Sequence, residues 1–209
     1  MRMGKVIFAA LMLLPLAGCA GDILKSTEPQ TTIYSLRPIE PTGDVPSDVL
    51  ARTLEISSPS VPPGMEQDRI ALFLDDGTKL DYFAGAKWTS SLDHVIREFT
   101  RRSASAVLPY VVAVTPEQSI PADYRLQIKI NEFQPVYAAG STAAPLLKAN
   151  FEFTLVRLPT DQIVTSFTLS KGQLAQENGL DSITLGLEDL LQEIEREAFE
   201  KIDSKLRVK

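Results

Sequence analysis

The centre of the fold is predicted by the stretch ANFEFTLVRLPTDQIVTSFTLSK, residues 149–171. Apolar and polar side chains alternate on both sides of Leu158-Pro159-Thr160-Asp161, a segment with the composition of a turn. Two such strands joined by a turn form an antiparallel hairpin, and one of its faces is expected to be buried. The buried set is expected to be Phe151, Phe153 and Leu155 on the first strand and Ile163, Thr165, Phe167 and Leu169 on the second.

Further strand signals lie before this hairpin. Residues 124–131 alternate between large apolar and polar side chains, as a half-buried strand does. Within residues 69–83, two apolar runs flank Asp75-Asp76-Gly77. Asp-Gly favours a hairpin turn, and calcium would need more oxygen ligands than this pair provides. Shorter strands are expected near 32–36, 52–56 and 110–114, and a loop rich in alanine and glycine at 135–147.

Two segments have apolar residues at helical spacing. The first has Leu92, Val95, Ile96, Phe99 and Val107, and the second has Ile183, Leu187, Leu190, Leu191, Ile194, Ala198, Ile202 and Leu206. Hairpins supply antiparallel pairing, and a sheet covered on one face by two helices would bury all these positions. We therefore expect an α+β fold, with a mixed, largely antiparallel sheet and two long helices packed on one face.

The N-terminal residues have the order of a bacterial export signal. Arg2 and Lys5 precede an uncharged run from Val6 to Ala17, which is too short to span a bilayer. The run ends in Leu16-Ala17-Gly18-Cys19, which resembles a lipobox. That resemblance implies a diacylglyceryl thioether on Cys19, cleavage before it and acylation of the new N-terminus. The alternative is that Cys19 is only a small apolar residue near the end of a signal.

This signal sets the expected domain organisation. Residues 1–18 form the lipoprotein signal peptide, residues 19–49 the lipidated N-terminus and a flexible proline-rich tether, and residues 50–209 the folded domain. Lipoprotein sorting rules place such proteins at the outer membrane when aspartate does not follow the cysteine. Because Ala20 follows Cys19, the resemblance favours the periplasmic face of the outer membrane.

Composition argues against several kinds of chemistry. The formal net charge of −6 is unlike that of a nucleic-acid-binding protein. The single cysteine rules out an intramolecular disulfide, and the single histidine, His94, has no cysteine or second histidine with which to bind a metal. No serine triad motif or glycine-rich phosphate loop is recognisable. We expect no catalytic residues, no metal, no cofactor and no enzyme activity.

Several short motifs resemble the family of ABC-type transport auxiliary lipoproteins, which includes the lipoprotein of the paraquat-inducible system. In chain order they are Tyr34-Ser35-Leu36, Ile56-Ser57-Ser58-Pro59, Arg69-Ile70-Ala71, Leu80-Asp81-Tyr82-Phe83-Ala84-Gly85-Ala86-Lys87-Trp88 and Ile128-Lys129-Ile130-Asn131-Glu132-Phe133. The resemblance implies a non-catalytic partner of a mammalian-cell-entry type lipid transport system. Its partners would be a periplasmic substrate-binding protein and an inner-membrane permease and ATPase, with phospholipid or another apolar molecule as cargo.

The aromatic residues Tyr82, Phe83 and Trp88 allow two interpretations. They could cover the edge of the core, or part of the cluster could be exposed and dock the bridging protein, because aromatic side chains are favoured at interfaces. Two other functions also stay open: an outer-membrane assembly factor, and a periplasmic carrier that binds lipid in its own cavity.

Overall fold

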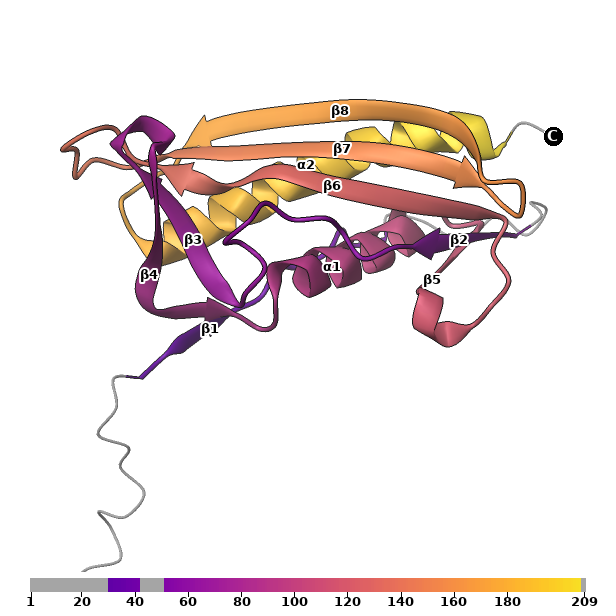
Figure 1. Cartoon of the computed structure of the whole chain (residues 1–209), viewed down its shortest axis with the longest axis horizontal. Helices are drawn as coiled ribbons and strands as arrows, with labels where there is room; N and C mark the ends of the chain where they lie inside the picture. The colour runs from indigo at the N-terminus through magenta and orange to yellow at the C-terminus, as the bar shows by residue number, and fades with distance from the viewer. Residues whose placement is uncertain (1–29, 42–50, 208–209) are drawn as a thin grey trace, which may run out of the picture. The chain divides into compact units, whose positions relative to one another are not determined.

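The computed structural model describes residues 30–41 and 51–207 and contains an eight-stranded sheet with two long helices (Figure 1). The strands are β1 (Thr32–Tyr34), β2 (Arg52–Ile56), β3 (Arg69–Leu74), β4 (Lys79–Trp88), β5 (Val111–Val114), β6 (Tyr124–Val136), β7 (Leu146–Arg157) and β8 (Gln162–Leu174). The helices are α1 (Leu92–Val107) and α2 (Leu180–Leu206), and the 3-10 turns are η1 (Asp75–Gly77) and η2 (Pro116–Gln118). Cys19 and the expected signal peptide lie outside the described residues.

Strand β6 organises the sheet. One of its edges pairs antiparallel with β7, which pairs antiparallel with β8. Its other edge is shared: β2 pairs with its beginning in parallel, and β3 meets its end at Val136. β2 also pairs with β5, while β3 forms an antiparallel hairpin with β4, whose far edge binds β1 in parallel. The expected hairpins at 69–83 and 149–171 are confirmed, and the sheet is mixed with antiparallel pairs as its longest ladders.

Both helices form where their spacing predicts, so the α+β fold class is confirmed. α2 packs against β7 and β8, and α1 packs against β5, β2 and α2. Gly186 is what allows α2 to approach β7 closely, because a Cβ atom there would come within 2.4 Å of Leu147 Cδ1. Among the described residues, neither helix is long and apolar enough to span a bilayer.

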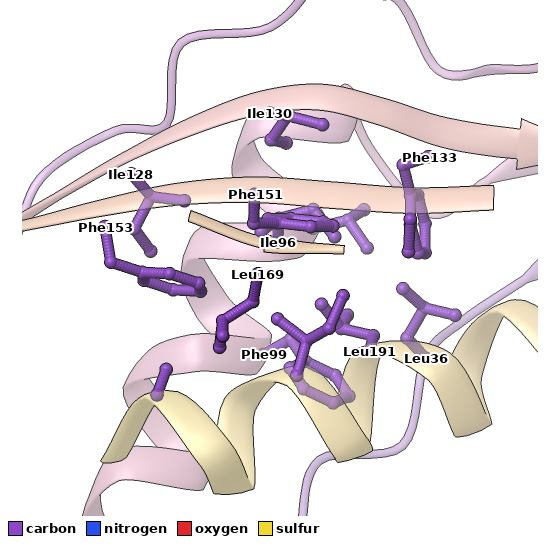
Figure 2. Close-up of a cluster of buried hydrophobic side chains, with 14 of the residues drawn as sticks. Leu36, Ile96, Phe99, Ile128, Ile130, Phe133, Phe151, Phe153, Leu169 and Leu191 are labelled. Atoms are coloured by element: carbon purple, nitrogen blue, oxygen red, sulfur yellow. The ribbon is translucent and has the colours of Figure 1, made fainter. Parts of the chain in front are cut away.

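The core lies between the sheet and the helices (Figure 2). A row of aromatic rings crosses the central strands: Phe133 and Phe151 meet edge to face at 5.8 Å between centroids, and Phe151 and Phe153 stack at 6.3 Å. Helix α1 contributes Ile96 and Phe99 from the opposite side. These side chains are fully or almost fully buried, and such close packing makes the sheet and helices one cooperative unit.

The second strand of the central hairpin departs from the expected alternation at one position. Thr165 pairs with Leu155, but Ile163 pairs with Val156, so Val164 is an extra residue in β8. Such a bulge turns the preceding side chains to the opposite face. The expectation that Ile163 is buried was therefore wrong: Ile163 is 64% exposed, and Val164 packs against the core instead.

The loop expected at 135–147 is shorter than its composition suggests. β6 continues through Pro135 to Val136, and β7 begins at Leu146, opposite Val136. Pro135 is tolerated because it lies at the end of the strand, where a missing N–H removes little pairing.

Candidate functional site: the N-terminal strap

Residues 34–40, which we call the strap, connect β1 to the helices. Leu36, Pro38 and Ile39 are buried, while Ser35, Arg37 and Glu40 are exposed. Pro38 favours this extended course because it fixes its own φ and disfavours helix at the residue before it. Burying side chains such as Leu36 and Ile39 contributes about 1.5–3 kcal/mol each before the cost of ordering the chain. The strap is therefore an integral part of the folded body.

A buried carboxylate on α2 holds the middle of the strap. Glu188 is 5% exposed. Its Oε2 accepts the backbone N–H of Arg37 at 2.6 Å, and its Oε1 accepts Nε of the same residue at 2.9 Å. The guanidinium Nη2 lies 2.8 Å from Oε1. Glu188 thus receives donors from both the backbone and the side chain of one residue, which fixes the register of the strap against α2.

Three further hydrogen bonds hold the strap on either side of Arg37. Gln192 Nε2 on α2 donates to the Arg37 carbonyl at 2.9 Å, and the Ile39 N–H donates to Ser103 Oγ on α1 at 3.1 Å. Before Arg37, the Tyr34 hydroxyl donates to Asp181 Oδ1 at 2.8 Å. Partial burial, together with this bond, raises the pKa of Tyr34. The strap therefore bonds to both helices.

A second acidic residue lies in the contact between α1 and α2. Glu195 is fully buried, and its Oε1 accepts the Thr100 hydroxyl at 2.6 Å. Its Oε2 has no hydrogen-bond partner among the described residues. Burial raises the pKa of Glu195 to about 8, since removal from water disfavours the charged form. At pH 7 the neutral acid is therefore the favoured state.

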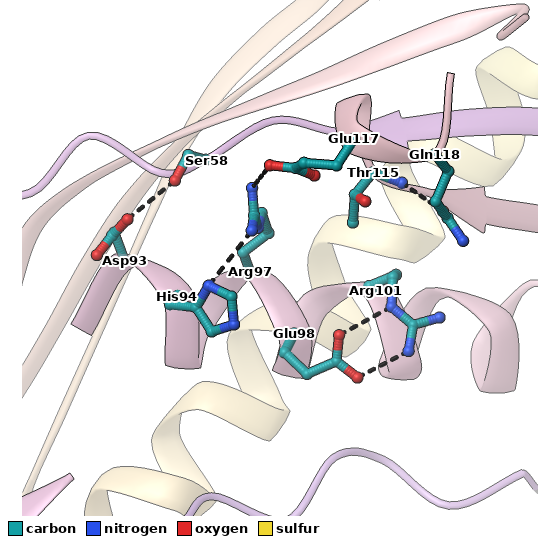
Figure 3. Close-up of polar contacts among 9 residues, drawn as sticks. All are labelled: Ser58, Asp93, His94, Arg97, Glu98, Arg101, Thr115, Glu117 and Gln118. Atoms are coloured by element: carbon teal, nitrogen blue, oxygen red, sulfur yellow. Dashed lines mark hydrogen bonds and ion pairs between the residues drawn. The ribbon is translucent and has the colours of Figure 1, made fainter. Parts of the chain in front are cut away.

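The outer face of α1 is polar and tied to its surroundings (Figure 3). The Ser58 hydroxyl donates to Asp93 at 2.9 Å, and Arg97 pairs with Glu117 in η2 at 2.8 Å. The pKa of Glu117 is lowered to about 2 by hydrogen bonds from its own backbone and from Thr115, together with the Arg97 guanidinium. His94, the only histidine, has its Nδ1 3.3 Å from Arg97. Within the described residues no cluster of three or more histidine, cysteine or acidic side chains could hold a metal ion.

The three aromatic residues considered for docking lie on β4 but differ in exposure. Trp88 is 2% exposed, and its ring packs 6.3 Å from that of Phe133. Tyr82 and Phe83 are half-buried. The Tyr82 hydroxyl donates to the Gly64 carbonyl, and the Arg69 guanidinium lies 3.9 Å from the Tyr82 ring centroid. The structure therefore places Trp88 in the core and leaves only parts of Tyr82 and Phe83 at the surface.

The two buried acidic residues of α2 were not predicted from the sequence, although a signal for them exists. Glu188 and Glu195 lie on the same helical row as apolar and small residues of the buried face: Thr184, Leu191, Ala198 and Ile202. Carboxylates at this spacing are costly to bury without partners. Two of them on one apolar row indicate that hydrogen-bond donors reach that face from elsewhere in the chain.

Comparisons with known proteins agree with this architecture. Two solved structures share the fold. The first is a protein from Xanthomonas campestris of the DUF330 family, with a TM-score of 0.68 at 19% identity over 81% of this chain and 93% of that one. The second is an uncharacterised protein, with a TM-score of 0.64 at 16% identity over 83% of this chain and 99% of that one. A hypothetical protein from Chlamydia trachomatis is more distant, with a TM-score of 0.48 at 11% identity over 75% and 98%. No curated protein matches the chain significantly in sequence.

The chain thus has the α+β fold of these two structures, and a match in sequence shows the family to which it belongs. The model of the ABC-type transport auxiliary lipoprotein component matches residues 34–197. The chain belongs to this family, as its motifs predict. The match begins at Tyr34, the first residue of the strap, and extends into α2. Family membership associates the chain with an ABC transport system and with the cell envelope.

Proposed function

We propose that the chain is the membrane-anchored, non-catalytic auxiliary component of a mammalian-cell-entry type lipid transport system. Cys19 carries the lipid anchor, and the protein lies at the periplasmic face of the outer membrane. There it binds the periplasmic substrate-binding protein, which bridges to the permease and ATPase of the inner membrane. The observation that carries this proposal is the family match over residues 34–197.

The strap supports an anchoring role. Within residues 30–41 and 51–207 it is the first part of the chain that bonds to the helices, through Asp181, Glu188 and Gln192 on α2 and Ser103 on α1. A load applied at the N-terminus is therefore shared by hydrogen bonds and buried side chains across two helices. Such an attachment joins the folded body firmly to the segment that leads to the proposed anchor, as a docking component requires.

The exposed parts of Tyr82 and Phe83 are the proposed contact with the substrate-binding protein. Trp88, packed on Phe133, supports β4 from beneath. Half-buried aromatic side chains suit this role because they offer large apolar area with little loss of side-chain freedom.

Purification from membranes tests the proposal. The tagged, acylated chain extracted in mild detergent is expected to bring with it a permease, an ATPase and a substrate-binding protein of the mammalian-cell-entry type. Phe83→Ser should reduce that recovery, whereas the matched control Ala84→Ser, at the exposed neighbouring position, should not.

Two results would favour the alternatives. Recovery of a β-barrel protein in place of the transporter would contradict the proposal in favour of an outer-membrane assembly factor. Stoichiometric phospholipid in the unacylated Cys19→Ser protein, detected by native mass spectrometry, would contradict it in favour of a lipid carrier.

A further inference from the structure

Strand β8 lies at the edge of the sheet and has one side without a partner. It pairs with β7 along its length, and among the described residues no strand pairs with its other edge. In Figure 1 it is the outermost strand at the top of the sheet. An unpaired strand edge presents a row of backbone N–H and C=O groups that can bind another extended chain.

The hydrogen bonds between β7 and β8 show which backbone groups lie at this edge. The Ala175 N–H donates to the Pro145 carbonyl at 3.0 Å, while Leu146 and Leu174 are opposite each other. In an antiparallel ladder this pattern makes Leu146 and Leu174 a non-hydrogen-bonded pair, and the alternation continues along the strand. The residues whose N–H and C=O groups point away from β7 are all exposed, and we call them the free edge: Ser166, Thr168, Ser170, Gly172 and Leu174.

The free edge lacks the features that usually protect an edge strand, which are prolines, bulges and outward-facing charges. From Ser166 to Leu174 there is no proline, and the bulge of β8 lies earlier, at Val164. The only charged side chain in this part of the strand is that of Lys171, which pairs with Glu197 of α2 at 3.2 Å. A second strand can therefore approach without meeting a charge on β8 or a missing N–H.

An acidic stripe on α2 runs beside the free edge: Asp189, Glu193 and Glu197. These residues are spaced by four, so they lie on one side of the helix. Asp189 lines the hollow between α2 and the end of β8, and Glu197 pairs with Lys171 in the strand. Glu197 also pairs with Lys201, but within the described part of the chain no ion pair involves Asp189 or Glu193. The stripe therefore keeps a net negative charge next to the free edge.

We propose that the free edge binds an extended segment of a partner protein that has a basic side chain at every second position. The segment would add one strand to the sheet. Because successive side chains of a strand point to opposite faces, one set would lie over the uncharged outer face of β8 and the other beside the acidic stripe. This inference goes beyond the proposed contact at Tyr82 and Phe83, since β3, β6 and β7 separate β4 from β8.

Charge argues against a second copy of the chain as the occupant. If the β8 strands of two copies paired about a two-fold axis, each copy would bring its own acidic stripe to the same face of the joined sheet. Like charges brought together in this way disfavour association, whereas a basic segment complements the stripe.

Peptide binding to the full acylated protein in a mild uncharged detergent tests this inference. The probes are two fluorescent peptides of about ten residues, the length of a long strand, in which threonine alternates with lysine or with glutamate. Ser170→Pro removes an N–H from the free edge but no bond to β7, and Ser170→Ala, which keeps that N–H, is the matched control. Glu193→Lys reverses one charge of the stripe at an exposed position. Urea midpoints of the variants show whether each one is folded.

We expect the lysine peptide to bind the parent roughly ten-fold more tightly than the glutamate peptide, and binding should weaken as salt is added. Ser170→Pro should lose this binding and Ser170→Ala should retain it. Glu193→Lys should weaken it several-fold, and this variant decides the matter if Ser170→Pro does not fold.

Three results would overturn the inference. The first is parent-level binding of the lysine peptide by folded Ser170→Pro or by Glu193→Lys. The second is equal binding, or no binding, of the two peptides by the parent. The third is a parent that is dimeric in detergent and becomes monomeric in Ser170→Pro, because a second copy would then occupy the free edge.

Discussion

Arg37 and Glu188, which are 151 positions apart in the chain, are joined by hydrogen bonds from both the backbone and the side chain of Arg37. The bond from the backbone N–H fixes where the strap lies along α2, and the guanidinium covers the outer side of the carboxylate. Because the segment that follows Cys19 leads directly into the strap, this pair connects the proposed anchor to the body of the fold.

Replacing Glu188 should weaken this connection. Glu188→Ala leaves the Arg37 N–H and the guanidinium without their acceptor, and losses of this kind cost about 1–3 kcal/mol. Urea unfolding of the soluble Cys19→Ser protein measures the change. Glu193→Ala, at an exposed position of the same helix, is the matched control and should stay near the parent value. Equal midpoints for the two variants would show that the strap adds nothing to stability.

Glu195 predicts a pH dependence of stability. Its pKa is raised from 4.5 to about 8 by burial. Between these values the folded state retains a proton that the unfolded state releases, so the free energy of unfolding falls as the pH rises through this window. One pKa unit corresponds to about 1.4 kcal/mol, and we expect a loss of roughly 2–4 kcal/mol between pH 5 and pH 8 from this residue.

The Glu195→Gln variant resembles the protonated acid and should lack this part of the pH dependence. It should therefore be more stable than the parent at pH 8 and close to it at pH 5. Glu200→Gln, at an exposed position of α2, serves as the control and should keep the parent profile. A difference between Glu195→Gln and the parent that stayed constant from pH 5 to pH 8 would contradict the proposed titration.

Trp88 and Phe83 should respond differently to substitution. Trp88→Ala removes a buried ring that packs on Phe133 and should cost about 3–5 kcal/mol, measured by thermal or urea unfolding. Phe83→Ser should change stability much less and act mainly on recovery of the substrate-binding protein. Loss of partner binding without loss of stability in Trp88→Ala would be inconsistent with the buried position of this ring.

Much of the fold is predictable from periodicity. The hairpin within 149–171 and both helices follow from apolar residues repeating every second position or every third and fourth. These patterns are reliable because each element buries one continuous face. The bulge at Val164 is not predictable in this way, since alternation alone made Ile163 and Thr165 look equivalent. Only the pairing with β7 shows that an additional residue separates them.

The candidate site was harder to predict for a different reason. The strap lies within a longer segment, residues 20–49, that is polar and contains four prolines, a composition typical of a flexible tether: Pro29, Pro38, Pro41 and Pro46. The strap is held in place by residues of α1 and α2 that are distant in sequence, and no pattern within the strap itself predicts those contacts. The same applies to Glu188 and Glu195, whose burial depends on donors from Arg37 and Thr100. The motifs for family membership, by contrast, lie in short contiguous segments.

The most direct test of the account is the intact mass of the protein extracted from membranes of the cells that make it. The account predicts a chain that begins at Cys19 and carries a diacylglyceryl group and a third acyl chain. The Cys19→Ser protein should keep its full N-terminus, lack these additions and leave the membrane fraction, whereas Ala20→Ser should behave as the parent does. An unmodified chain starting at Met1, or a Cys19→Ser protein that stays as firmly bound to the membrane as the parent, would contradict the account.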